Sequence, residues 1–92
     1  MNLKGKKGII LGIANQKSIA WGCAQSLKQA GADFGVTYLN EALEKRVRPL
    51  AAEISADFVI ECDATNSEHL ERLANQAKQS YGHIDFIIHS VA

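Results

Sequence analysis

The sequence predicts an α/β fold built on a doubly wound parallel sheet, and three observations support this prediction. Four short runs are apolar at consecutive positions, which is typical of strands that are buried on both faces. Three segments with helical spacing of apolar residues separate these runs. Because the resulting order is βαβαβαβ with right-handed crossovers, we expect a Rossmann-like half with strand order 3-2-1-4.

The first predicted strand is the apolar run 9–11, which ends in Gly12, and a helical pattern begins near Ser18. A helix N-terminus carries unpaired N–H groups and partial positive charge, so it can bind a phosphate without lysine or arginine. The common G-x-G-x-x-G fingerprint is absent, because Ala14 occupies the position of its second glycine and the next glycine is Gly22. This segment is therefore either a dinucleotide-binding turn or an ordinary connection between a strand and a helix.

The first helix and the elements after it follow from the same kind of pattern. Gly31 is placed to end the first helix, and a second strand is expected over 34–39. Asn40 can cap the second helix, in which Pro49 removes one backbone donor and predicts a kink or a break. The apolar stripe predicted for the first helix consists of Ile19, Cys23, Leu27 and Ala30.

The second half of the chain continues the alternation. A third strand over 58–60 precedes Thr65 and Glu68, which have the spacing of a capping box for a third helix. Gly82 can end that helix, and a fourth strand is expected over 86–88. The apolar positions of the third helix are Leu70, Leu73, Ala74, Ala77 and Tyr81.

Composition excludes several classes of protein. With 47% hydrophobic and 22% charged residues, the 92-residue chain can form a single core. Ten basic residues balance ten acidic ones, so no net charge draws the chain to nucleic acid or to an anionic membrane. Its apolar runs are far shorter than the roughly 20 residues that span a bilayer, and we expect a soluble, cytoplasmic protein. Cys23 and Cys62 are far apart with no paired histidines, so neither a metal site nor a disulfide is predicted.

Several separate segments agree with one known family: 12–14 (GIA), 18–22 (SIAWG), 37–38 (TY), 41–47 (EALEKRV), 62–63 (CD) and 89–90 (HS). Together they resemble the amino-terminal half of bacterial NADH-dependent enoyl-acyl carrier protein reductase, a divergent branch of the short-chain dehydrogenase/reductases. The resemblance covers the whole chain, and the spacing GxxxxxSIAxG is its most distinctive part. It implies that 1–92 are the dinucleotide-binding half of a Rossmann-fold domain, and that the catalytic half is absent. It further implies NADH as cofactor, an enoyl-acyl carrier protein as substrate in fatty acid biosynthesis, and a homotetramer.

The resemblance also implies which residues bind the cofactor. It puts Gly12 against the ribose and pyrophosphate, the helix start at Ser18 on the phosphates, Asp63 at the adenine, and 90–92 under the nicotinamide-side ribose. The full predicted set is Gly12, Ala14, Ser18, Ile19, Leu39, Asp63, Ala64, Ser90 and Val91. The alternative for Asp63 is a turn or helix-entry carboxylate with no ligand.

Leu39 departs from the pattern of many NAD enzymes, which have an acidic residue at the end of the second strand. Glu41 is close enough in sequence to substitute for that acid. No lysine or arginine follows the strand immediately, where it could hold a 2′-phosphate. NADH is therefore favoured over NADPH.

No catalytic residue is predicted within the chain. Reduction of an enoyl thioester needs a hydride from the nicotinamide and a donor that stabilises the developing enolate. The family takes its tyrosine and lysine from beyond the fourth strand, and the resemblance assigns no such role to Tyr38 or Tyr81. His69 and His83 are expected at the surface, and His89 is expected to be structural. The 92 residues alone are therefore predicted to be inactive.

Two other functions stay open at this point. Lys17 and Ser18 after Gly12 suggest a P-loop phosphotransferase, although that motif needs a glycine where Gln16 stands. The second is a nucleotide-binding module without chemistry of its own. In a doubly wound sheet the fourth strand would be an open edge, so at least one of its two isoleucines should lack cover, and the chain should be loosely packed or self-associate.

Overall fold

The sheet of this protein has the predicted order and direction. The computed structural model describes residues 2–13 and 19–89, and within these ranges four strands alternate with three helices. The strands lie in the order β3-β2-β1-β4, and each neighbouring pair is parallel. The elements are β1 (Lys7–Leu11), α1 (Ile19–Gln29), β2 (Asp33–Tyr38), α2 (Glu41–Glu53), β3 (Val59–Glu61), α3 (Ser67–Tyr81) and β4 (Phe86–His89).

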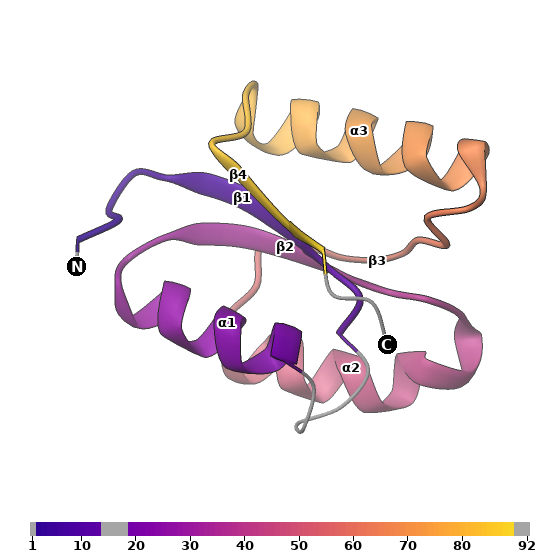
Figure 1. Ribbon diagram of the computed structural model, residues 1–92, viewed down its shortest axis with the longest axis horizontal. Helices are drawn as coiled ribbons and strands as arrows, with labels where there is room; N and C mark the ends of the chain where they lie inside the picture. The colour runs from indigo at the N-terminus through magenta and orange to yellow at the C-terminus, as the bar shows by residue number, and fades with distance from the viewer. Residues whose placement is uncertain (1, 14–18, 90–92) are drawn as a thin grey trace.

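Helices cover both faces of the sheet, as expected from the crossovers. The pair α1 and α2 lies on one face, and among the described elements only α3 lies on the other (Figure 1). Two separate apolar clusters fill the spaces between these layers. The larger one contains Ile10, Phe34 and Val36 of the sheet together with buried residues of α1 and α2. The smaller one joins Ile9 and Cys62 to Leu73 and Ala77 of α3.

The register of the sheet depends on two glycines that face aromatic rings. Gly8 of β1 is paired with Phe86 of β4, and an added Cβ at Gly8 would overlap the Phe86 ring. In the same way, a Cβ at Gly35 of β2 would overlap the Phe58 ring. Phe86 packs against the larger cluster and Phe58 against the smaller one. Each face of the sheet therefore contains one ring that lies over a glycine.

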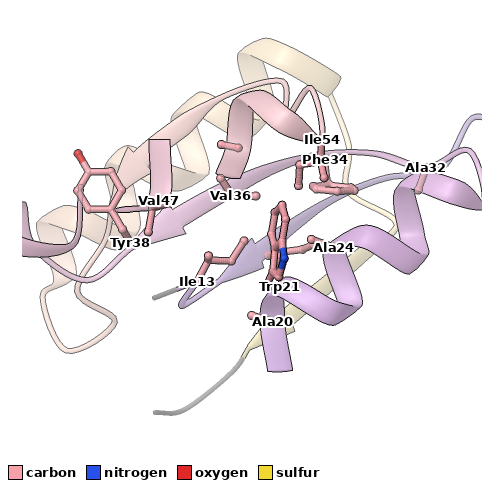
Figure 2. Close-up of a cluster of buried hydrophobic side chains, with 12 residues drawn as sticks. Ile13, Ala20, Trp21, Ala24, Ala32, Phe34, Val36, Tyr38, Val47 and Ile54 are labelled. Atoms are coloured by element: carbon pink, nitrogen blue, oxygen red, sulfur yellow. The ribbon is translucent and has the colours of Figure 1, made fainter. Parts of the chain in front are cut away.

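The apolar stripe predicted for α1 is wrong in part. Figure 2 shows the Trp21 ring pointing from α1 into the larger cluster, and the buried positions of α1 are Ala20, Trp21 and Ala24. Ile19 is 80% exposed and Cys23 is only half-buried. The small alanines let α1 approach the sheet closely, and the large indole then fills the space beside them. Ile19 and Cys23 of the predicted stripe instead line a surface hollow together with Ile88 of β4.

Pro49 does not break α2. The helix is continuous from Glu41 to Glu53, and Asn40 occupies its N-cap position without a side-chain capping bond. Pro49 is exposed, whereas Val47 and Ala51 are buried against the sheet. Because the missing N–H lies on the solvent side, water can satisfy the backbone carbonyl that loses its partner, and burial of the other face maintains the helix.

The N-terminus of α3 is capped by Asn66, and the capping box predicted at Thr65 is wrong. The Asn66 Oδ1 atom accepts from the backbone N–H groups of Glu68 and His69, at 2.9 and 3.3 Å. Gly82, at a φ of 78°, ends the helix as predicted. Of the apolar positions predicted for α3, Leu73 and Ala77 are buried, whereas Leu70 and Ala74 are exposed.

The edge strand β4 has the uncovered face that the sequence predicts. Ile87 is 59% exposed, while Ile88 is half-buried against the larger cluster. Within the described ranges, no helix is long and apolar enough to cross a membrane.

Candidate functional site

The carboxyl ends of the strands bring the predicted site residues to one edge of the sheet. In open parallel sheets, ligands bind outside this edge, where the strand order reverses. Here β1 is followed by Gly12, β2 by Leu39, and β3 after one further residue by Asp63. Because β1 lies between β2 and β4, its carboxyl end is the point of reversal. The residues at these strand ends therefore form the candidate site.

The turn after β1 is tied to β2 by a buried threonine. Gly12 has a φ of 92°, a left-handed conformation that favours glycine. Its N–H donates to the Thr37 Oγ1 atom at 3.2 Å, and the Ile13 N–H donates to the Thr37 carbonyl at 3.2 Å. Thr37 is fully buried. The sequence includes Thr37 among the segments that resemble the reductases, but nothing in the strand pattern shows that it anchors this turn.

The segment after β3 is also tied to β2. The Cys62 N–H donates to the Tyr38 carbonyl at 2.8 Å. The end of β2 thus contacts the turn of Gly12 through Thr37 and the segment of Asp63 through Tyr38. The turn of Gly12 and the segment of Asp63 are predicted to bind opposite ends of the cofactor's adenosine diphosphate. Both are hydrogen-bonded to the end of β2.

Asp63 forms the turn that the sequence offered as the alternative to a ligand site. Its Oδ1 atom accepts from the Thr65 hydroxyl at 2.6 Å and from the Thr65 N–H at 2.9 Å. The hydroxyl bond, followed by the backbone bond, holds the pKa of the Asp63 carboxyl below its ordinary value, so this side chain is ionised at neutral pH. The Oδ2 atom has no hydrogen-bond partner within the described part of the chain. The turn therefore leaves one carboxylate oxygen available to a ligand.

The sequence predicts a surface position for His69, and this prediction is only partly correct. Its side chain is half-buried, and its Nδ1 atom accepts a hydrogen bond from the Asp63 N–H at 2.9 Å. A contact across six residues between a loop and a helix has no periodic signature, so the sequence does not reveal it. His83 lies at the surface as predicted, with a 70% exposed side chain 3.5 Å from Asp85.

The other predicted residues differ in how far the structure describes them. Ile19 opens α1, and Leu39 is 47% exposed directly after β2, while Ala64 is exposed after Asp63. His89 ends β4 and is exposed. Four of the predicted residues lie outside the described ranges, namely Ala14, Ser18, Ser90 and Val91.

Neither tyrosine is free to act as a donor at this edge. Tyr81 lies near the opposite edge, where its hydroxyl donates to Asp57, at 2.6 Å, just before β3. Burial, together with Asp57, raises the pKa of the Tyr81 hydroxyl well above its ordinary value. Tyr38 is buried between β2 and α2 (Figure 2), and burial followed by Glu44 raises the pKa of its hydroxyl. Across the described ranges, no group of three or more possible ligands could hold a metal ion.

Comparison with known proteins identifies the family. The family model for enoyl-(acyl carrier protein) reductase matches residues 12–92. This chain belongs to the enoyl-acyl carrier protein reductase family. Two curated relatives are the NADH-dependent reductase FabI of Rickettsia felis, 49% identical over 98% of this chain, and reductase 2 of Rhizobium meliloti, 44% identical over 97% of it.

A solved reductase has the same arrangement of strands and helices. The crystal structure of the Anaplasma phagocytophilum reductase in complex with NAD superposes with a TM-score of 0.87 and 38% identity. It covers 92% of this chain, which in turn covers 32% of that protein. The chain also spans only 35% and 33% of the two curated relatives.

Proposed function

We propose that residues 1–92 form the dinucleotide-binding half of an NADH-dependent enoyl-acyl carrier protein reductase. The complete enzyme would reduce the double bond of an enoyl group carried by acyl carrier protein, in fatty acid biosynthesis. The observation that carries this proposal is the pair of anchored strand ends, Gly12 bonded to Thr37 and Cys62, next to Asp63, bonded to Tyr38, in a chain of this family. The NAD bound to the Anaplasma phagocytophilum relative supports the choice of cofactor.

The residues at the sheet edge fit a dinucleotide. Gly12 has no side chain, so a ribose and pyrophosphate can approach its backbone closely. The ionised Asp63 carboxylate has its Oδ2 atom available to accept from the exocyclic amine of adenine, and the Ala64 N–H can donate to a ring nitrogen. In this proposal the start of α1, with Ser18 and Ile19, receives the phosphates.

The remaining predicted contacts belong to the same proposal. It assigns Ala14 to cofactor binding, and Ser90 with Val91 to the nicotinamide-side ribose, although these three residues lie outside the described ranges. Leu39 lies beside the adenosine ribose, with Glu41 able to accept from its hydroxyls. The absence of a basic side chain directly after β2 supports NADH over NADPH.

Hydride transfer itself would be supplied by bound NADH. The donor to the developing enolate would come from the part of the family's chain that is not represented here, because both Tyr38 and Tyr81 are engaged elsewhere. The chain by itself should therefore bind NADH without reducing a crotonyl thioester. We further propose a cytoplasmic location and a homotetramer for the complete enzyme.

The test is titration of the 92-residue chain with NADH and with NADPH by calorimetry, beside a circular dichroism melt of the same sample. The expected result is saturable binding of NADH that is tighter than binding of NADPH. A folded chain that binds neither nucleotide would refute the proposal. Oxidation of NADH by a mass-verified sample with crotonyl thioester would instead refute the assignment of the catalytic donor to other residues.

A further inference from the structure

The segment between β3 and α3 is held by hydrogen bonds at almost every residue. The Cys62 N–H donates to β2, and the Asp63 N–H donates to the His69 ring. The Asp63 carbonyl accepts from the Asn66 N–H at 2.8 Å. The peptide groups on both sides of Asp63 are therefore fixed, and the one before it is fixed by a side chain of α3.

The His69 ring is itself held in place. Its own backbone N–H donates to the Asn66 cap, so the ring is attached to the first turn of a capped helix. Only an unprotonated Nδ1 atom can accept from the Asp63 N–H, so the bond selects the neutral tautomer with the proton on Nε2. This defines the ring's orientation as well as its position.

We infer that His69 is a positioning residue for the adenine end of the cofactor site. The orientation of the peptide before Asp63 sets the direction of the Asp63 Cα–Cβ bond, and hence the place of the Oδ2 atom. The following residue, Ala64, supplies the N–H that would meet the adenine ring. Without the Nδ1 acceptor, the partly buried Asp63 N–H would lose its partner, and the peptide could rotate toward water. This inference rests on the proposed function, since it needs adenine to bind at Asp63.

The inferred role predicts an effect that is confined to the adenine base of the cofactor. The phosphates and the nicotinamide ribose are assigned to residues that follow β1 and β4, whereas within the described ranges His69 is hydrogen-bonded to Asp63 and Asn66. Misplacing Asp63 should therefore reduce recognition of the exocyclic amine and leave the rest of the cofactor's binding in place. In deamino-NADH, the hypoxanthine analogue, a carbonyl oxygen replaces this amine and the neighbouring ring nitrogen N1 carries a proton, so the analogue can form neither the proposed contact with Asp63 nor the one with the Ala64 N–H.

The experiment compares the affinities of the chain for NADH and deamino-NADH. The wild-type chain should prefer NADH several-fold. His69→Leu should weaken NADH about fivefold, as expected for one hydrogen bond, and leave deamino-NADH nearly unchanged, so the preference disappears. His69→Asn should retain the preference, because its Oδ1 atom can occupy the place of Nδ1. His83→Leu, at the other end of α3, is the control and should behave as the wild type.

The possible outcomes separate the inference from the proposed function. If the folded wild-type chain binds no NADH, the proposed function fails. If NADH binds and His69→Leu keeps the wild-type preference, the role of His69 is refuted. If His69→Leu does not fold, His69→Gln replaces it, since its amide oxygen reaches one bond too far to meet the Asp63 N–H. A preference retained in His69→Gln, or lost in His69→Asn, then refutes the inference.

Discussion

Replacing Thr37 by valine should loosen the turn after β1 while keeping the shape of the buried side chain. The Gly12 N–H would lose its acceptor, at a cost of about 1–3 kcal/mol for an unpaired, partly buried donor. The added methyl group would return about 0.8 kcal/mol through burial. The expected net loss of stability is therefore about 1 kcal/mol, and NADH affinity should fall several-fold because the turn that we propose to face the ribose is no longer held.

A matched variant separates the two effects. Thr37→Ser keeps the hydroxyl and deletes one buried methyl group, which should also cost about 1 kcal/mol of stability. Urea denaturation can follow the single tryptophan, Trp21, which lies in the larger core cluster. With stability matched in this way, calorimetric titration should find weaker NADH binding only in Thr37→Val. Equal NADH affinity in the two variants would refute the argument that the Thr37 hydroxyl supports the cofactor turn.

Three further predictions concern other parts of the molecule. Asp63→Asn keeps an oxygen that can accept from Thr65 but removes the negative charge. Calorimetry should therefore find NADH binding about tenfold weaker, with an unchanged melting temperature. A variant that loses stability but keeps its NADH affinity would show that Asp63 is a turn residue only. The Lys7 ammonium, bonded to Asp33 at 2.7 Å, lowers the pKa of the Asp33 carboxyl in the folded chain. The ion pair therefore contributes its full stabilisation of the fold above the ordinary pKa of 3.8, and loses it as the pH falls through the lower pKa of the folded state. Urea denaturation at low salt should therefore find that, between pH 5 and pH 2, Asp33→Asn loses less stability than the wild type. Parallel curves of stability against pH for the two proteins would contradict this. Ile87→Thr replaces an exposed apolar side chain of β4, so it should leave the melting temperature within a few degrees of the wild type. It should reduce self-association in sedimentation experiments. Unchanged self-association would show that the open edge of β4 plays no part in it.

The order of elements and the sheet topology could be predicted from the sequence because both depend on local signals. Runs such as 9–11 are apolar on consecutive positions, and glycines such as Gly31 and Gly82 end the helices that precede them. Right-handed crossovers then leave few possible arrangements. The placement of the first two helices on one face, with the third on the other, follows from the same rule.

The details that failed all depend on packing or on competition between neighbours. The buried side of α1 is decided by where the sheet lies, and Trp21 with two alanines fits there better than the stripe that begins at Ile19. Thr65 and Asn66 are adjacent residues that can both cap a helix. The Thr65 hydroxyl instead donates to the Asp63 carboxylate, and Asn66 caps α3. The bond from Asp63 to His69 joins residues with no shared period, so only the folded chain reveals it.

The two rings that lie over glycines determine how the site is aligned. If β4 slipped by two residues along β1, the Phe86 ring would meet Lys6 or Ile10, both of which have side chains where Gly8 has none. Such a slip would displace His89 by about 6.6 Å relative to Leu11, at a rise of about 3.3 Å per residue. The alignment of the strand ends that form the candidate site is thus set at the far end of the sheet. A substitution at Gly8 could therefore abolish nucleotide binding from a position that touches no nucleotide.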